Sequence, residues 1–360
     1  MLEYIRPASL KLGDKLGRTI YNTQGNVLIK AGISLTDNMI KTIQTQGYKG
    51  VYIDRVENAE RESIRIQEPI IDDYTTIKVI SIISRILKNK NIYTNAWDNS
   101  FTKDRQQLEE YINEFYKLFK EKNIKKQLIF EMEDSRNNDN WVEYHSFNTM
   151  QLAMAIAMRM GYPETEVKGI AAAGLMHDIG KGKYPELINK KDLTEAEKNL
   201  LRTHPRTIFE VLTGLSGIFA SNACTYGCWQ SHELYDGSGY PMGLSGSKIT
   251  TYGYIVGAAN RFDDLIHKTP FNDEPMNNDE ALEYLMGSNL YQVEVIKALT
   301  EVVSVYPVGT KIRLSNGQEG LAESNNMSLP LRPNIVIGYK RVNLASDEEY
   351  RNVTVQEVIS

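Results

Sequence analysis

Apolar residues recur every three or four positions through most of residues 70–304, and this spacing is typical of helices that bury one face. The clearest segments are 142–160 and 164–176, with a break at Gly161-Tyr162-Pro163 between them. Further helices are expected within 70–131, after the capping signal at 194–197, from His204-Pro205, from 216 to near 232, over 255–267 and over 292–304. The pattern therefore predicts a mainly α fold.

The two ends of the chain follow another pattern, in which short apolar stretches alternate with turn residues. Residues 18–21 and 27–30 flank a turn and predict a hairpin, after which a short helix and a strand at 50–53 are expected. From Tyr306 onward, glycine and asparagine separate short strands. We expect a small α+β accessory module at 1–66, a helical connecting region and linker at 67–140, a helical domain at 141–304 and a β-rich tail at 305–360.

Composition excludes several classes of function. The net charge of -5 and the isoelectric point near 5.7 lack the basic surplus that general nucleic-acid binding requires. No apolar run approaches the roughly 18 residues of a membrane span, and the first residues do not resemble a secretory leader. Two cysteines in 360 residues argue against a disulfide framework. A cytoplasmic protein without membrane association is expected.

Histidine is rare in this chain and is concentrated in one region. Four of the five histidines lie in the expected helical domain, namely His145, His177, His204 and His232. His177 is followed by Asp178 where a helical pattern runs into Gly180, and at a helix end the two side chains can converge on one point. Histidine together with aspartate is a ligand set for zinc, manganese or iron. A surface His-Asp pair and a helical scaffold with incidental histidines are the alternatives.

A carboxylate that bridges two metal ions can help them to activate water and to clamp a phosphodiester. Asp178 is the natural bridging residue, and the histidines divide into a first pair, His145 with His177, and a second pair, His204 with His232. Lys181 follows Asp178 closely enough to reach a phosphate oxygen. These residues therefore indicate metal-dependent phosphoester chemistry, with Asp178 and Lys181 as the catalytic groups.

The motifs and their order resemble the HD-GYP family, a branch of the HD metal-dependent phosphohydrolases, over residues 141–304. The matching segments are Glu143-Tyr144-His145-Ser146, His177-Asp178-Ile179-Gly180-Lys181, Thr194-Glu195-Ala196-Glu197 leading to His204-Pro205, and His232-Glu233 leading to Gly239-Tyr240-Pro241. The resemblance implies hydrolysis of cyclic di-GMP to the linear dinucleotide or GMP, with iron or manganese as the metal. It also implies that Lys181, Gly239, Tyr240 and Pro241 bind the substrate.

Four positions depart from the family pattern. Ser231 replaces a ligand histidine, Asn260 stands where a ligand aspartate is expected, and Trp141 replaces the glutamate of a third metal. Thr269 stands where a phosphate-binding arginine is expected. Because a lost carboxylate weakens binding of a divalent cation, we expect one or two ions, with Asn260 as a carbonyl ligand. Four residues near these positions are candidates to compensate, namely Glu143, Asp263, Asp264 and, if one helix continues to residue 232, Cys228.

Two functions follow from this pattern. The first is a metal-dependent cyclic di-GMP phosphodiesterase. The second is a degenerate domain that binds a nucleotide or a protein without hydrolysis, which the departures at Ser231, Asn260 and Thr269 favour. For either function, the N-terminal module is a candidate site for binding a protein partner or for forming a homodimer.

Overall fold

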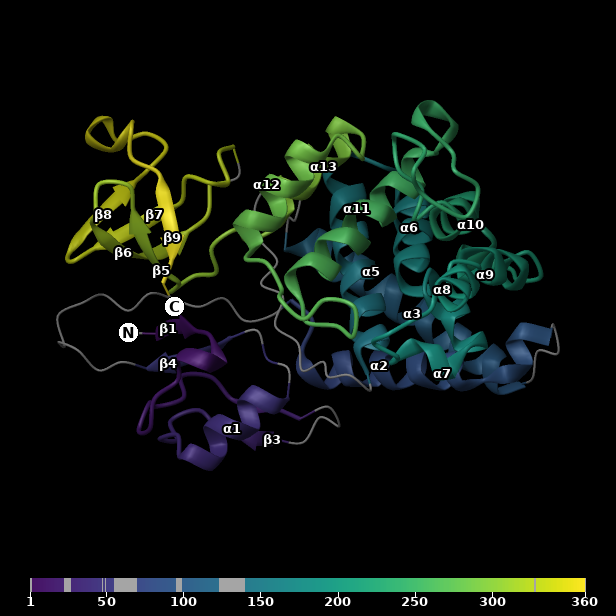
Figure 1. Ribbon diagram of the computed structural model, residues 1–360, viewed down its shortest axis with the longest axis horizontal. Helices are drawn as coiled ribbons and strands as arrows, with labels where there is room; N and C mark the ends of the chain where they lie inside the picture. The colour runs from purple at the N-terminus through teal and green to yellow at the C-terminus, as the bar shows by residue number, and fades with distance from the viewer. Residues whose placement is uncertain are drawn as a thin grey trace.

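The computed structural model describes residues 2–22, 27–46, 48, 50–54, 70–94, 99–122, 140–326 and 328–359. A helical domain lies beside two smaller parts, the N-terminal module and the C-terminal sheet, which are both on its left in Figure 1. The helices of the domain and of the region before it are α2 (Asp73–Lys88), α3 (Asn99–Glu121), α5 (Trp141–Arg159), α6 (Glu164–Met176), α7 (Pro185–Ile188), α8 (Glu195–Leu201), α9 (His204–Leu212), α10 (Asn222–Trp229), α11 (Thr251–Ile266), α12 (Asn278–Ser288) and α13 (Val293–Val302), with 3₁₀ helices η2 (Lys90–Thr94), η3 (Ile179–Lys183), η4 (Gly217–Ala220) and η5 (Gly246–Lys248). The predicted mainly α fold is confirmed.

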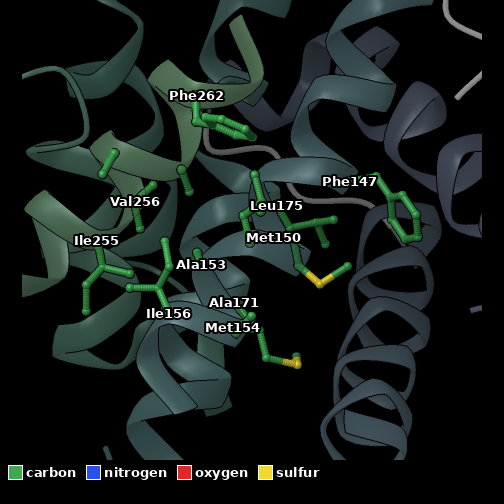
Figure 2. Packing of buried hydrophobic residues seen from close by; sticks show 14 of the residues in the cluster. Phe147, Met150, Ala153, Met154, Ile156, Ala171, Leu175, Ile255, Val256 and Phe262 are labelled. Carbon is green, nitrogen blue, oxygen red and sulfur yellow. The ribbon is translucent and has the colours of Figure 1, made fainter. Parts of the chain in front are cut away.

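Helix α5 lies at the centre of this domain and packs against α6, α11, α13 and α2. It is buried almost all round, so that Met150 and Met154 pack in the core with Leu175 of α6 and Phe262 of α11 (Figure 2). Gly174 permits a close approach of the backbones, because a Cβ there would lie only 2.8 Å from Cα of Met150. The central helices are thereby held at fixed positions, and α5, α6 and α11 each carry residues of the candidate site.

Helices α2 and α3 share this core, although the sequence predicts a separate connecting region at 67–140. Ile83 and Phe115 are buried in the same hydrophobic cluster as α5. Tyr93 of η2 donates a hydrogen bond to the carbonyl of Ile179, 2.7 Å away. The boundary at 140 stays a prediction, and residues 134–139 of the expected linker lie outside the described residues.

The two ends of the chain form small sheets. In the N-terminal module, β1 (Leu2–Ile5) pairs antiparallel with β4 (Val51–Asp54), and β2 (Ile20–Tyr21) pairs with β3 (Val27–Ile29), which confirms the predicted hairpin. Helix α1 (Asp37–Thr45) follows β3, and η1 (Pro7–Ser9) follows β1. The tail is a five-stranded antiparallel sheet in the order β8-β7-β6-β5-β9. Its strands are β5 (Lys311–Leu314), β6 (Glu319–Ser324), β7 (Asn334–Ile337), β8 (Lys340–Asn343) and β9 (Val355–Val358), with η6 (Glu348–Tyr350) before the last.

The terminal parts touch each other, as the N-terminal strand and the tail sheet lie side by side in Figure 1. The Tyr4 amide donates a hydrogen bond to the carbonyl of Gly309 at 3.2 Å, and Tyr4 forms a parallel bridge with Thr310. Among the described residues, no helix is both long enough and apolar enough to cross a bilayer.

One sequence expectation about helices is wrong, and one helix was not predicted. The helix expected to run from 216 to near His232 is divided into η4 and α10, and α10 ends at Trp229. His232 therefore lies in the turn after the helix, where the polar loop begins. Helix α12 was not anticipated, because its Asn277 cap is preceded by a polar stretch that is typical of a loop.

Candidate metal centre

The predicted histidines come together from the interior of α5, the end of α6, the start of α9 and the turn after α10. His145 lies within the buried helix α5, whereas His177 and Asp178 follow the last turn of α6. His204 is the first residue of α9, where Pro205 is tolerated because the first-turn amide needs no intrahelical partner. His232 lies three residues after α10. His145, His177 and Asp178 are each 1% exposed or less, so residues far apart in the sequence form one buried cluster.

These residues form two groups of potential metal ligands that share Asp178. The first contains His145 and His177, the second contains His204 and His232, and within each group the ligand atoms lie within 4.8 Å of one another. The Nε2 atoms of His145 and His177 are 3.3 Å apart, and those of His204 and His232 are 2.9 Å apart. The predicted bridging position of Asp178 therefore has a geometric basis.

Backbone carbonyls fix the tautomers of two histidines. Nδ1 of His177 lies 2.8 Å from the carbonyl of Gly174, and Nδ1 of His204 lies 2.7 Å from that of Leu201. Because a carbonyl can only accept, each Nδ1 carries the proton and each Nε2 presents a lone pair. Both lone pairs face Asp178, whose Oδ1 lies 3.1 Å from Nε2 of His204 and 3.6 Å from that of His177.

The electrostatics of the cluster favour ligands that are ready to bind a cation. Burial lowers the pKa of His177 to about 4 and that of His232 to about 3, so both are neutral at pH 7. Burial opposes the charge on Asp178, but the Lys181 ammonium, 2.5 Å from Oδ2, holds the pKa of Asp178 well below its usual range. Burial also opposes a charge on His145, yet the carboxylates of Asp264 and Asp263 raise its pKa.

A divalent cation fits this donor set. Asp178 Oδ1 is buried and accepts no hydrogen bond from the described residues, and the nearest groups are imidazole nitrogens that bear lone pairs. Such an arrangement of acceptors is unfavourable by itself and becomes favourable around a metal ion. Imidazole and carboxylate together suit zinc, iron and manganese.

Asp263 of α11 supports the first group from behind. Its Oδ2 lies 2.7 Å from Nδ1 of His145, and its Oδ1 accepts a hydrogen bond from Asn148 at 3.0 Å. Nδ1 of His267 lies 3.0 Å from the same Oδ1. Sequence reasoning named Asp263 as a substitute ligand but missed Asn148 and His267. The signal for His267 was its position four residues after Asp263 on one helix.

The loop with Gly239-Tyr240-Pro241 borders the second group. The ring of Tyr240 stacks on His232 with centroids 4.7 Å apart and an interplanar angle of 7°. The buried carboxylate of Glu233 accepts the amides of Met242 and Leu244 at 2.7 and 2.8 Å, and so holds the loop in place. Glu233 therefore stabilises the loop, a role that its sequence position beside His232 does not indicate.

Asn260 contacts the imidazole of His232 on the side away from Asp178. Its Nδ2 lies 3.4 Å from Nδ1 of His232, while its Oδ1 is buried and has no partner among the described residues. This contact involves the side of the imidazole opposite to Nε2, so Asn260 is well placed to orient His232. Its predicted role as a metal ligand stays a prediction.

The other three residues that depart from the family pattern, Ser231, Trp141 and Thr269, lie around the candidate metal centre. Ser231 is turned away, since its hydroxyl donates to the carbonyl of Cys228 at 3.0 Å. Trp141 is buried beside His145, with ring centroids 6.2 Å apart, and donates to Asn189. Thr269 is buried and bonds to the backbone of Asn272 at 3.0 Å.

The candidates for compensation gain no support from their positions. Neither potential ligand group includes Glu143, Asp263, Asp264 or a cysteine from the described residues. Glu143 bonds to Ser84 of α2, and burial raises its pKa. The thiol of Cys228 points to the carbonyl of Ala173 at 3.5 Å, and burial raises its pKa well above the usual value.

Part of the chain is similar to a known family and to several named proteins. The family described as HD domain matches residues 121–291. The cyclic di-GMP phosphodiesterase PA4108 of Pseudomonas aeruginosa is 30% identical over 206 residues, which are 56% of this chain and 49% of the relative. The response regulator RpfG of Xanthomonas campestris, also a cyclic di-GMP phosphodiesterase, is 38% identical over 41% of this chain and 40% of its own length. A cyclic di-GMP phosphodiesterase of Thermotoga maritima is 31% identical over 62% of this chain and 63% of the relative. The chain thus matches between 40% and 63% of the length of these curated relatives.

Proposed function

Because the HD domain family matches residues 121–291 and the similar proteins are named cyclic di-GMP phosphodiesterases, we propose that the chain is a metal-dependent phosphodiesterase of the HD-GYP type that hydrolyses cyclic di-GMP to the linear dinucleotide or GMP. The observation that carries the proposal is the pair of ligand groups that share the buried Asp178. Two ions bound to one carboxylate lie close enough to act on the same phosphodiester.

Each residue of the site has a defined task in this proposal. When bound, the cations supply Lewis acidity to the phosphodiester and lower the pKa of water. Asp178, which is common to both groups, would help to hold both ions and would bring the negative charge that compensates them. Lys181 neutralises charge on the scissile phosphate, because its ammonium lies at the edge of the site beside Asp178. His145 and His177 would hold one ion, and His204 and His232 would hold a second.

Iron or manganese is the proposed metal, in one or two ions. The four histidines supply imidazole nitrogens, which suit iron, and the aspartate supplies carboxylate oxygens, which suit manganese. The bordering residues Gly239, Tyr240 and Pro241 line the substrate side, and Asn260 contributes either a carbonyl ligand or the orientation of His232. We place the protein in the cytoplasm, which its free cysteines suit, and keep a homodimer or partner at the N-terminal module as part of the proposal.

A degenerate, non-hydrolysing domain is the second candidate. The specific observation in its favour is that neither Ser231 nor Asn260 supplies an anionic ligand. The Ser231 hydroxyl donates to the carbonyl of Cys228 in the last turn of α10, and Asn260 is uncharged. Fewer anionic ligands weaken metal binding. Such a domain would bind the nucleotide without turnover.

Turnover by the metal-loaded protein decides between these functions. The protein is purified without oxygen, loaded with Mn²⁺ or Fe²⁺, and incubated separately with cyclic di-GMP, cyclic GMP-AMP and bis(p-nitrophenyl) phosphate, with products separated by chromatography. We expect the linear dinucleotide or GMP, and loss of turnover in His204→Asn. Asp236→Asn is the matched control, since Asp236 is exposed and bonds only within its loop to Ser238.

Tight binding of cyclic di-GMP with no turnover of any of the three substrates would contradict hydrolysis and support the degenerate domain. Thermal unfolding of each variant shows whether the loss reflects the site or the fold.

A further inference from the structure

Two aromatic rings, each carrying a cation on its face, flank the metal centre on different sides. The Lys181 ammonium lies 5.0 Å from the centroid of the Trp141 ring, which borders His145 of the first ligand group. The Arg202 guanidinium lies 5.8 Å from the centroid of the Tyr240 ring, which borders His232 of the second group. Each ligand group thus has its own cation.

These two cations differ in their partners. Lys181 is held by Asp178 at 2.5 Å. Arg202 is exposed, and within the described part of the chain its side-chain hydrogen bond goes to the neutral Asn199 at 3.5 Å, with no carboxylate within ion-pair distance. Its charge is therefore available to an anion.

Two other cations of the domain are engaged by a carboxylate, since Lys191 and Lys268 both lie within 4 Å of Asp273. The Arg261 guanidinium lies over the Tyr284 ring, at 5.7 Å, rather than over Tyr240. Because buried Thr269 supplies no charge, Arg202 remains as the cation beside the second ligand group.

Tyr240 contacts both His232 and Arg202. The imidazole of His232 is parallel to the Tyr240 ring and covers one of its faces. The Arg202 guanidinium lies 5.8 Å from the centroid of the same ring. Arg202 therefore borders the second ligand group through Tyr240, whereas Lys181 contacts Asp178 directly, and this difference suits Arg202 to a second anion.

We propose that Arg202 binds the second, non-scissile phosphodiester of a cyclic dinucleotide while Lys181 serves the phosphodiester at the metal ions. This inference rests on the proposed function and adds the recognition of the substrate class. A cyclic dinucleotide carries two phosphodiesters, whereas a simple diester carries one. The planar guanidinium can donate two parallel hydrogen bonds to phosphate oxygens, and Tyr240 supports it from behind.

The test compares one substrate that has two phosphodiesters with one that has a single phosphodiester. For Arg202→Ala, loaded with Mn²⁺, we expect KM for cyclic di-GMP to rise about 10- to 100-fold with kcat nearly unchanged. The kcat/KM for bis(p-nitrophenyl) phosphate is expected to stay within about twofold, because a surface residue off the reacting phosphate contributes little there. Arg202→Lys retains the charge but not the paired hydrogen bonds, so its KM is expected to lie between those of wild type and Arg202→Ala.

Arg206→Ala is the matched control. Arg206 lies four residues later, and its side chain is 77% exposed and paired with Glu210 at 3.2 Å. Its removal is expected to leave both substrates unaffected. Binding of the bisphosphorothioate analogue of cyclic di-GMP is measured in parallel as a readout independent of turnover.

The outcomes separate this inference from the proposed function. If wild type hydrolyses cyclic di-GMP and Arg202→Ala has the same KM and the same analogue affinity, the inference is overturned while the function stands. If wild type binds the analogue without hydrolysing any substrate, and Arg202→Ala loses that binding, the proposed function fails while the inference stands. An equal loss with both substrates would also overturn the inference, because it would show a general effect on the site.

Discussion

Oδ2 of Asp263 lies 2.7 Å from Nδ1 of His145, on the side of the imidazole opposite to Asp178. Nε2 of the same ring is 3.6 Å from Oδ2 of Asp178. The carboxylate therefore fixes the orientation of the ring and favours a proton on Nδ1, which leaves Nε2 for a metal. Such carboxylate partners of ligand histidines raise the basicity of the ligand.

Asp263→Asn is expected to weaken metal binding about 10- to 100-fold, because an amide is a poorer acceptor for the Nδ1 proton. The measurement is competition for Mn²⁺ against a chelator of known affinity. Asp264→Asn is the charge-matched control, because it also removes a negative charge near His145 but its Oδ1, 3.6 Å from Nδ1, accepts no hydrogen bond from it, so a smaller loss of affinity is expected. Equal affinities of Asp263→Asn and wild type would show that Asp263 does not support the metal ligand.

The neutral His232, whose side chain is 11% exposed, makes the stability of the metal-free protein depend on pH. Its pKa is lowered from 6.5 to about 3, so between these values the unfolded chain binds a proton that the folded chain does not. The contribution of His232 to the free energy of unfolding is therefore fully present above the pKa of the unfolded chain. Below that pKa it decreases as the pH falls, by up to about 1.4 kcal/mol per pH unit.

His232→Asn removes this titration. In urea unfolding with a chelator present, the difference in the free energy of unfolding between wild type and His232→Asn should shrink as pH falls from 7 toward 5, by about 1–2 kcal/mol. A difference that does not change with pH would contradict the neutral state of His232.

Glu233→Gln is expected to loosen the loop that contains Tyr240. Glu233 accepts two backbone amides, from Met242 and Leu244, and hydrogen bonds to a charged acceptor are worth about 1.5–3 kcal/mol. Amide hydrogen exchange at Met242 and Leu244 should therefore accelerate about tenfold or more. Asp236→Asn, in the same loop but exposed, should leave the exchange of these two amides unchanged. Unchanged exchange in Glu233→Gln would show that Glu233 does not hold the loop.

Gly174→Ala tests the close packing of α5 and α6. The new Cβ would lie 2.8 Å from Cα of Met150, which is backbone and cannot turn aside, so we expect a loss of about 1–3 kcal/mol in the free energy of unfolding. Gly287→Ala is the matched control, since Gly287 lies in helix α12 with nothing within 4 Å of its new Cβ. It should gain about 0.5–1 kcal/mol. Stability equal to wild type in Gly174→Ala would show that the two helices can separate without cost.

Local signals allowed much of the fold to be predicted from the sequence. The capping box at Thr194 and Glu197 and the proline after His204 fixed the starts of α8 and α9 correctly. Periodicity located α5 and α6 because their apolar positions repeat over several turns. The end of α10 at Trp229 was not foreseen, since no glycine or proline marks it.

The candidate site was predicted in its residue types and only partly in its contacts. The motifs identified the histidines and Asp178, whereas the bond between His145 and Asp263 joins residues 118 positions apart and depends on how α5 crosses α11. The position of Arg202 over Tyr240 similarly depends on the loop that Glu233 holds. Contacts of this kind follow from packing and have no local signal in the chain.

The most direct test of the central claim, that Asp178 joins two metal sites, is a Mn²⁺ titration followed by electron paramagnetic resonance. The shared carboxylate and the two ligand groups predict two ions per chain whose spins are coupled, and one uncoupled ion in His204→Asn. A single uncoupled ion in wild type, or no bound Mn²⁺ at all, would contradict the bridged centre.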